Sequence, residues 1–368
     1  MSSALPNTAA LVSGSTEPGK YIQVQDIPYP KATEDQLIVK GLAFAINPTD
    51  WKHADFGVGK KGAVAGTDVA GTVETVGANV QGFSKGDFVS VFLHGNVDEY
   101  GAFQKFVVAN PSTTVKLPSK FPVDPLQPGE YPSSTIQSFE GASTIPLGLA
   151  TIGVSFAIEL NIPLLQGSNS NKYILLWGGA TATGILAIQI AKHVYGLKVL
   201  TTASKHNHEF LKSLGADEVF DYKDSSAIEE LSKYDISYAL DVFGTVETFQ
   251  QTYDATKNSK DVRLDNLFAI FDDKIKKDSR SGKATFVTPT MSYIAVGHPV
   301  DAYGRHWNLT DEGFNRYKQF WFEALPKYLP ELKHAGLKVL KQGFENADEG
   351  YTLNKEGKVS AQKIVFRA

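Results

Sequence analysis

Residues 173–184 read YILLWGGATATG, an apolar run followed by a run of small residues. The short apolar run Tyr173–Trp177 favours a strand, and small residues follow it as a turn. The segment Ala182–Val194 then carries apolar residues at three- and four-residue spacing, which predicts a helix. When a helix begins directly after a strand and a turn of small residues, the backbone N–H groups at its start can bind a phosphate.

The glycines of this turn are spaced as in a dinucleotide-binding motif. Gly179 and Gly184 match the first and third glycines of G-x-G-x-x-G, while Thr181 stands at the second. The Thr181 side chain restricts the approach of the backbone, but its hydroxyl is expected to bond a phosphate oxygen. A tight turn in an unrelated α/β protein is the alternative. The residues expected to bind the diphosphate are Gly179, Ala180, Thr181, Ala182, Thr183 and Gly184.

Strands and helices alternate from Lys172 onward. A second helix is expected at Glu209–Leu214. Strands are expected at Tyr173–Trp177, Lys198–Thr202, Glu218–Phe220, Ile236–Val242, Leu267–Phe271 and Tyr293–Val296. Such alternation predicts a parallel sheet with right-handed crossovers. We therefore expect a doubly wound cofactor domain over residues 161–310.

The first third of the chain has the pattern of a β-rich domain. Short runs of β-branched and aromatic residues predict strands at Tyr21–Val24, Gln36–Leu42, Gly71–Val76, Phe88–Leu93 and Phe103–Val108. Pro118–Pro132 is expected to be a surface loop, and Gly141–Leu160 and Phe314–Leu332 are expected to be helical. Val359–Phe366 is expected to be a strand that returns to the first domain, which would then comprise residues 1–160 and 311–368.

The composition excludes several classes of protein. The net charge is −4 and no block of five Lys or Arg occurs, which argues against a nucleic-acid partner. The chain has no cysteine, so it has no disulfide, thiol nucleophile or cysteine-ligated metal. Met1–Gly14 lacks the features of a signal peptide, and we expect no apolar stretch of 18 residues. A cytoplasmic protein with no membrane partner is expected.

The end of the second strand indicates which dinucleotide binds. NAD enzymes place an acidic residue there for the ribose 2′-hydroxyl, but Thr201–His206 contains no carboxylate. A hydroxyl, a cation and an imidazole favour a 2′-phosphate, and Tyr222 adds a phenolic donor. The expected contacts are Ser204, Lys205, His206, Asn207 and Tyr222, and the expected cofactor is NADPH. The alternative is a solvated basic loop.

Several motifs together resemble one family. They are Ala45–Lys52, Gly66–Gly71, Gly86–Val89, Gly101–Phe103, Gly178–Gly184, Leu214–Asp217, Phe220–Tyr222 and Tyr303–Arg305. With these motifs the chain resembles the zinc-independent, quinone-oxidoreductase-like branch of the medium-chain dehydrogenase/reductases. It looks most like fungal aldehyde and enoyl reductases, some of which act in trans on polyketide chains. The resemblance implies an α/β fold: a GroES-like β-rich catalytic domain and a Rossmann domain with a doubly wound parallel sheet.

The resemblance also implies that the site holds no zinc. Zinc-dependent members of the family carry a cysteine where Asn47 stands, a histidine–glutamate pair near Thr67 and Asp68, and a second cysteine around Thr151. A lobe with four cysteines is also missing. Of the eight histidines none is paired with carboxylates at zinc-ligand spacing, and His206 and His208 are interpreted as cofactor-loop or surface residues.

Candidate catalytic residues follow from the same resemblance, because the family's matching loop lies over the nicotinamide. Asn47 and Thr49 are expected to donate hydrogen bonds, and Lys52 or His53 to donate a proton, unless the latter two are solvent-facing or structural. Thr151 is expected near the nicotinamide, or else as a buried threonine bonding its own helix. Asp50 is expected to orient its neighbours, and Trp51 to line a pocket or pack in the core. Further cofactor contacts are expected at Pro48, Asp50, Trp51, Val296, Gly297 and Lys363.

The expected reaction is hydride transfer from NADPH to an activated carbonyl compound, either an α,β-unsaturated ketone or aldehyde, or a simple aldehyde. Without a metal, hydrogen-bond donors must polarise the carbonyl group. A quinone reductase and a non-catalytic NADPH-binding accessory protein are the alternatives. A carrier-bound acyl chain as substrate stays open, as does the choice between a monomer and a homodimer.

Overall fold

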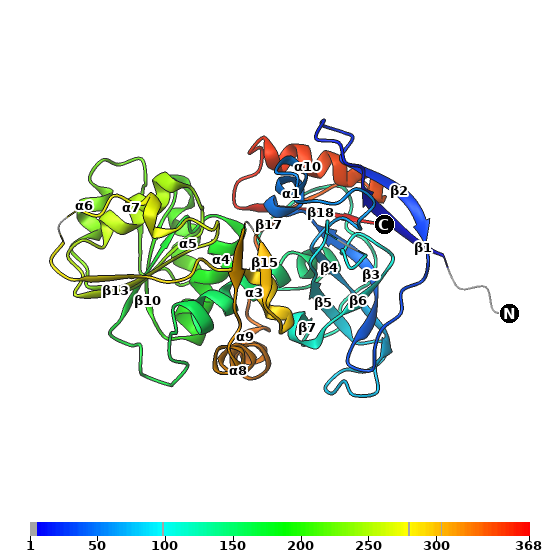
Figure 1. Cartoon of the computed structure of the whole chain (residues 1–368), viewed down its shortest axis with the longest axis horizontal. Helices are drawn as coiled ribbons and strands as arrows, with labels where there is room; N and C mark the ends of the chain where they lie inside the picture. Colours follow the sequence, from blue (N-terminus) through cyan, green and yellow to red (C-terminus); the bar gives the residue numbers. More distant parts are fainter. Residues whose placement is uncertain (1–5, 98, 279, 303) are drawn as a thin grey trace. The chain divides into compact units, whose positions relative to one another are not determined.

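The computed structural model describes residues 6–97, 99–278, 280–302 and 304–368 (Figure 1). Residues 1–5 of the N-terminal segment and Tyr303 of the family motif lie outside the described residues. The chain forms two compact units: the first runs to Leu147 and resumes at Leu329, and the second is Gly148–Tyr328. The expected boundaries at 160 and 311 differ, because the helical segments 148–159 and 311–328 pack together. The Arg316 Nε, for example, donates to the Ala157 carbonyl at 2.8 Å.

The first unit is built on a largely antiparallel sheet. Its strands are β1 (Asn7–Val12), β2 (Ile22–Ile27), β3 (Leu37–Ala45), β4 (Asp68–Val76), β5 (Phe88–Phe92), β6 (Phe106–Ala109), β7 (Thr114–Lys116), β8 (Gly129–Tyr131), β17 (Gly336–Val339) and β18 (Gln362–Arg367). Its helices are α1 (Pro48–Asp55), α2 (Phe139–Ser143) and α10 (Ala347–Lys355), with single 3₁₀ turns at Pro111–Thr113 and Phe344–Asn346. The main sheet has the order β7-β5-β4-β3-β18-β17-β8, while β6 pairs with β3 and β1 pairs with β2.

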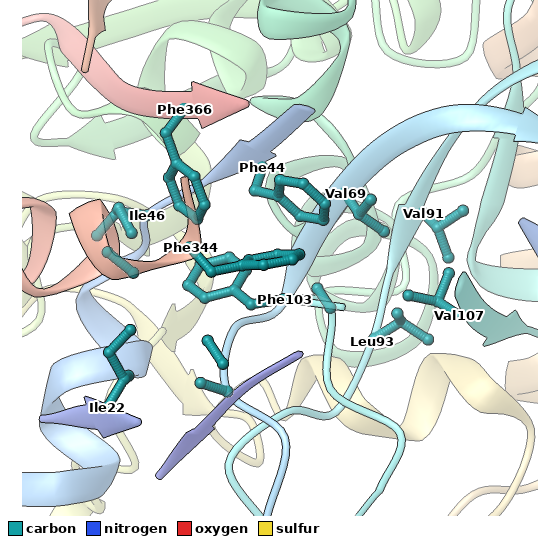
Figure 2. Close-up of a cluster of buried hydrophobic side chains, with 14 of the residues drawn as sticks. Ile22, Phe44, Ile46, Val69, Val91, Leu93, Phe103, Val107, Phe344 and Phe366 are labelled. Carbon is teal, nitrogen blue, oxygen red and sulfur yellow. The ribbon is translucent and has the colours of Figure 1, made fainter. Parts of the chain in front are cut away.

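Aromatic side chains fill the core of the first unit (Figure 2). Phe44, Phe103 and Phe366 are fully buried, and the Phe44 and Phe366 rings stack with their centroids 5.4 Å apart. Phe103 meets Phe366 edge to face at 5.1 Å. Because Phe366 comes from β18, the last strand, this core joins the C-terminal strand to elements from the first third of the chain. The expected return of the C-terminal segment to the first domain is confirmed.

The second unit is built on a parallel sheet of order β11-β10-β9-β12-β13-β14. Its strands are β9 (Tyr173–Trp177), β10 (Lys198–Thr202), β11 (Glu218–Phe220), β12 (Ile236–Asp241), β13 (Asp261–Asn266) and β14 (Lys283–Phe286), and β15 (Val300–Ala302) pairs with β16 (Arg305–Trp307). Its helices are α3 (Pro146–Gly153), α4 (Ala182–Gln189), α5 (His208–Ser213), α6 (Ala227–Leu231), α7 (Val246–Ala255), α8 (Asp311–Lys318) and α9 (Leu325–Tyr328). Wider π turns continue three of them at Val154–Glu159, Ile190–Val194 and Gln319–Ala324, and 3₁₀ turns lie at Lys205–Asn207, Asp272–Lys274 and Ser292–Val296.

The strand order places the glycine turn at the centre of this sheet. β9 lies between β10 and β12, and every residue of β9 after Tyr173 is buried, as in a sheet covered on both faces. The order reverses direction between β9 and β12, and ligands of open α/β sheets bind at such a point, beyond the carboxyl ends of the strands. The expected parallel sheet is confirmed.

Two expected strands are wrong. Leu267–Phe271 is a loop: the Asn266 side chain accepts from the Phe268 and Ile270 N–H groups, and the left-handed φ of Ala269 (52°) breaks any extended run. Tyr293–Val296 lies in a 3₁₀ turn that ends at Gly297, whose φ of 100° favours glycine. Short apolar runs fit a strand or a buried helical turn equally well. The fifth and sixth strands are instead β13 and β14, and the sequence interpretation missed both.

The absence of a long apolar stretch was also a wrong expectation. Phe139–Glu159 is a helical stretch of 21 residues that is apolar enough to cross a membrane by length and composition. Within the protein, 89% of its most apolar window is buried. A buried helix of this kind is typical of a protein core.

Candidate functional site

The glycine turn after β9 has the geometry of a phosphate-binding turn. The N–H groups of Gly178 and Gly179 bind the Thr202 hydroxyl at 3.0 Å and the Thr202 carbonyl at 2.9 Å. A Cβ at Gly179 would lie 2.1 Å from the Thr201 Oγ1, so only glycine lets the turn pack on β10. The first-turn N–H groups of α4, at Ala182 and Thr183, have no carbonyl of their own helix to bind. A diphosphate fits this helix start.

The role expected for Thr181 needs correction. Thr181 is the N-cap of α4: its hydroxyl accepts from the Gly184 N–H at 3.0 Å and donates to the Gly178 carbonyl at 2.9 Å. That hydroxyl has no second hydrogen for a phosphate oxygen. Thr181 therefore shapes the turn, because its two bonds hold the first turn of α4 against Gly178.

The loop after β10 brings together the residues expected at the 2′-phosphate. The Ser204 hydroxyl and the Tyr222 phenol lie 3.1 Å apart, and Tyr222 is 46% exposed. Lys205 is exposed, and within the part of the chain that the structure describes its ammonium has no carboxylate partner. His206 is exposed, whereas Asn207 is buried and caps α5. Two hydroxyls thus lie together beyond the carboxyl ends of β10 and β11, and Lys205 directly follows Ser204 in the chain.

Val296 and Gly297, the other expected contacts in this unit, lie at the end of the 3₁₀ turn after β14. Val296 is half-buried and Gly297 is exposed. Thr151 lies in α3 and is 8% exposed. Its buried helical position agrees with the alternative interpretation, a threonine within the helix.

In the first unit, the residues around Asn47 form a buried polar network, which we call the Asn47 network: Asn47, Asp50, Thr67, Asp68 and Lys363. All five side chains are at most 6% exposed. The Asn47 amide donates to the Thr67 hydroxyl at 3.0 Å and to the Asp68 carboxylate at 2.8 Å. Thr67 donates to Asp50 at 3.1 Å, and Asp50 also accepts from the Asn47 N–H at 2.7 Å. The second Asp68 oxygen accepts from the Leu147 N–H at 2.8 Å.

Lys363 completes the Asn47 network. Its ammonium donates to the Asn47 side-chain carbonyl and lies 3.5 Å from the Asp68 carboxylate. Burial raises the pKa of Asp50 to about 7, and it raises the pKa of Asp68 and lowers that of Lys363. These contacts correct two expectations. Asn47 was expected to donate to a substrate or cofactor, but both N–H groups of its amide already bind protein acceptors. Lys363 was expected to contact the cofactor, but its ammonium is directed at the Asn47 network.

Helix α1 carries the remaining candidates. Lys52 is half-buried, and burial lowers its pKa to about 8. His53 is buried, and burial lowers its pKa to about 4, so its ring is neutral near pH 7. The Thr49 hydroxyl lies 3.3 Å from the His53 Nδ1. Trp51 packs against the aromatic core and donates to Asn354 at 2.9 Å, which agrees with the core-packing alternative, while Pro48 is exposed. Near pH 7 Lys52 is therefore protonated and His53 is not.

Sequence reasoning missed two buried carboxylates at the carboxyl edge of the parallel sheet. Asp241, at the end of β12, accepts from the Phe243 and Gly244 N–H groups and from the Thr248 hydroxyl. Asp265, near the end of β13, accepts from the Ser155 and Thr290 hydroxyls at 2.6 Å each. Burial raises the pKa of each to about 6. For Asp241 the available signal was an acidic residue at the end of the predicted strand Ile236–Val242, whereas Asp265 lies in β13, which was not predicted.

The donor set of the Asn47 network suits hydrogen bonding better than metal binding. Its two carboxylates already accept hydrogen bonds from an amide, a hydroxyl and backbone N–H groups, an ammonium lies beside them, and it offers none of the thiolate or imidazole ligands of zinc. Among the residues that the structure describes, no group of three or more His, Asp or Glu side chains is placed to hold a metal ion.

Comparisons with known proteins agree with this division of the chain. Residues 33–119 match the family model described as alcohol dehydrogenase GroES-like domain, and residues 182–262 match the model described as zinc-binding dehydrogenase. The first match lies within the β-rich unit, and the second begins at the first residue of α4, directly after the glycine turn. The expected fold class, a GroES-like domain with a Rossmann domain, is confirmed.

Fungal proteins are similar over nearly the whole chain. An uncharacterized protein of Saccharomyces cerevisiae is 32% identical over 99% of this chain and 99% of its own length. The trans-enoyl reductase ACTTS2 of Alternaria alternata is 33% identical over 94% of this chain and 95% of its own length.

Two solved structures share the fold. The quinone oxidoreductase of Coxiella burnetii has a TM-score of 0.64 at 22% identity, covering 99% of both chains. A mycobacterial protein solved in complex with NADPH has a TM-score of 0.65 at 20% identity, covering 98% of this chain and all of its own.

Proposed function

Since this chain belongs to the zinc-independent medium-chain dehydrogenase/reductases and is an oxidoreductase with a nicotinamide cofactor, we propose that it transfers a hydride from NADPH to an activated carbonyl compound. The substrate class is an α,β-unsaturated ketone or aldehyde, or a simple aldehyde. The similarity to ACTTS2, named a trans-enoyl reductase, supports reduction of a conjugated double bond.

The cluster of Ser204, Lys205 and Tyr222 carries the preference for NADPH. Its two hydroxyls are 3.1 Å apart, and the neighbouring ammonium is exposed and has no carboxylate partner among the residues described. A 2′-phosphate would receive charge-assisted hydrogen bonds there, whereas a 2′-hydroxyl would leave the cation unused. The mycobacterial structure with NADPH, which shares this fold, supports the same choice.

The chain's own residues have separate tasks in this reaction. The first turn of α4 holds the diphosphate, and the loop after β10 holds the 2′-phosphate. When bound, NADPH supplies the hydride for the substrate β-carbon and becomes NADP⁺. We assign to Lys52 the proton for the α-carbon; its ammonium is half-buried, and burial lowers its pKa to about 8. One hydride and one proton together saturate the double bond.

A substrate panel tests the reaction. We expect purified protein to oxidise NADPH with enals or enones, as followed by the absorbance of the reduced nicotinamide. Aldehydes, quinones and a carrier-bound enoyl chain form further arms, because relatives are named quinone oxidoreductase and trans-enoyl reductase. NADPH binding without turnover on any arm would favour the accessory-protein alternative.

Lys205→Glu tests the cofactor preference. Hydrogen bonds to charged groups contribute ~1.5–3 kcal/mol, so we expect the Kd for NADPH to rise about tenfold or more and the Kd for NADH to change little. Lys212→Glu is a matched control, since Lys212 is an exposed lysine on the neighbouring helix α5. Equal changes for both cofactors in Lys205→Glu would show that the 2′-phosphate is bound elsewhere.

A further inference from the structure

Lys363 is a buried cation that the proposed reaction does not use. It lies on β18, between β3 and β17, and is 6% exposed. Its ammonium donates to the Asn47 side-chain carbonyl and lies 3.5 Å from Asp68. A buried ammonium is unfavourable unless charges and hydrogen bonds compensate it, so these contacts fix where its head group lies.

The charges around Lys363 explain why an ammonium is needed there. Asp50 and Asp68 are both buried, at 1% and 0% exposure, and Lys363 is the cation paired with them in the described part of the network. Two carboxylates in one dry site repel each other. The Lys363 charge therefore allows the carboxylates to act as acceptors for Asn47 and Thr67.

Two residues of the Asn47 network, Asn47 and Asp50, lie at the start of helix α1. Asn47 is the N-cap residue of α1, and its N–H is held by Asp50 in the first turn at 2.7 Å. The Asn47 side chain is in turn held by Lys363 on one side and by Thr67 and Asp68 on the other. Lys52 lies in the same short helix, so the start of α1 sets where its side chain lies.

We propose that Lys363 is a positioning residue that fixes Asn47 and the start of α1, and through them Lys52. This proposal rests on the proposed function for its catalytic consequence. The contacts to Asn47 and Asp68 carry this role, because they hold the ammonium beside the N-cap residue of α1.

Lys363→Met tests the proposal by separating binding from turnover. Because small misplacements of a reacting group cost up to about a hundredfold, we expect kcat to fall about tenfold or more while the Kd for NADPH stays within about twofold. Lys338→Met is the control: Lys338 lies on the adjacent strand β17 and pairs at 3.7 Å with the exposed Glu130. A large rise in the Kd for NADPH with unchanged kcat at saturation would overturn the proposal.

A double-mutant cycle with Asn47→Ala tests the path of the effect. If Lys363 acts through Asn47, the double variant Asn47→Ala/Lys363→Met loses no more kcat than the worse single variant. Losses that multiply would contradict this path. Lys363→Gln keeps a hydrogen-bond donor and remains informative if the methionine variant does not fold: we expect it to retain more kcat than Asn47→Ala, and equal or greater loss would count against the proposal.

Hydrogen exchange on the protein without cofactor supplies a readout that needs no activity. We expect the backbone amides of α1 to exchange faster in Lys363→Gln than in the wild type, and those of α4 to be unchanged. Unchanged exchange in α1 would overturn the positioning role. If the wild type does not oxidise NADPH, the proposed function fails, yet this exchange measurement still decides whether Lys363 holds α1.

Discussion

The protonation of two neighbouring residues on α1 follows from their burial. Lys52 has a pKa lowered to about 8 and His53 one lowered to about 4, in both cases because burial disfavours the charged form. Near pH 7 the ammonium therefore carries a proton and the imidazole does not. Only the protonated form of Lys52 can deliver a proton, so this form is present below pH 8 and lost as the pH rises through that value.

We therefore predict that kcat falls as the pH rises through about 8. Lys52→Met should be slower and lack this limb, and Lys52→Arg should keep its charge and shift the limb to higher pH. The measurement is kcat against pH at saturating NADPH with an enal substrate. The same limb in Lys52→Met would assign the titration to another group.

Gly179 offers a second test at the scale of one residue. The Cβ of Gly179→Ala would lie 2.1 Å from the Thr201 Oγ1, so we predict a loss of about 1–3 kcal/mol in the free energy of unfolding, as for an overpacked core. Urea denaturation measures this loss. The added cost of the alanine should shrink in a Thr201→Ala background, and an equal cost in both backgrounds would rule out this contact as the cause.

At the scale of elements, a buried ion pair ties β18 to α2. The Arg367 guanidinium binds the Glu140 carboxylate through Nε at 2.7 Å and Nη2 at 3.1 Å, and Glu140 also accepts from the Leu126 N–H at 2.9 Å. Glu140 is fully buried and Arg367 nearly so. Replacing one partner leaves the other charge without compensation in the interior.

Glu140→Gln should therefore lower the free energy of unfolding by about 3–5 kcal/mol, as measured by chemical denaturation. Glu130→Gln is the matched control, because Glu130 is exposed and exposed ion pairs contribute at most ~1 kcal/mol. A loss in Glu140→Gln no larger than in the control would contradict this account of the pair.

The elements also show what the sequence can predict. The sequence predicts four elements to the residue: β9, α4 with its π turn, β10 and β11. Glycine turns and changes in the spacing of apolar residues mark where these elements begin and end. β14, only four residues long and half-buried, has no such signal. The Asn47 network was beyond reach for another reason: Lys363 and Asn47 are 316 residues apart, and only the pairing of β18 with β3 brings them together.

At the scale of the whole molecule, each unit has its own core. The first is lined by Phe44, Phe103 and Phe366, and the second by residues such as Leu175, Phe249 and Leu264. The glycine turn belongs wholly to the second unit. A ligand that binds only the folded form of that unit stabilises it by mass action.

We predict that NADPH at about a hundred times its Kd raises the free energy of unfolding of the second unit by ~2.7 kcal/mol. Trp51→Phe makes this measurable, since the remaining tryptophans, Trp177, Trp307 and Trp321, all lie in the second unit. Their fluorescence then reports that unit alone. An unchanged midpoint with NADPH would mean that the glycine turn does not hold the cofactor.

The position of β18 also sets an order on biosynthesis. A nascent chain that has left the ribosome as far as Tyr328 contains the entire second unit. At that point β18, which lies between β3 and β17 in the finished sheet, has not yet been made. Open strand edges are prone to wrong pairing. The edge of β3 at residues 43–45 is therefore covered only after residues 362–367 have been synthesised.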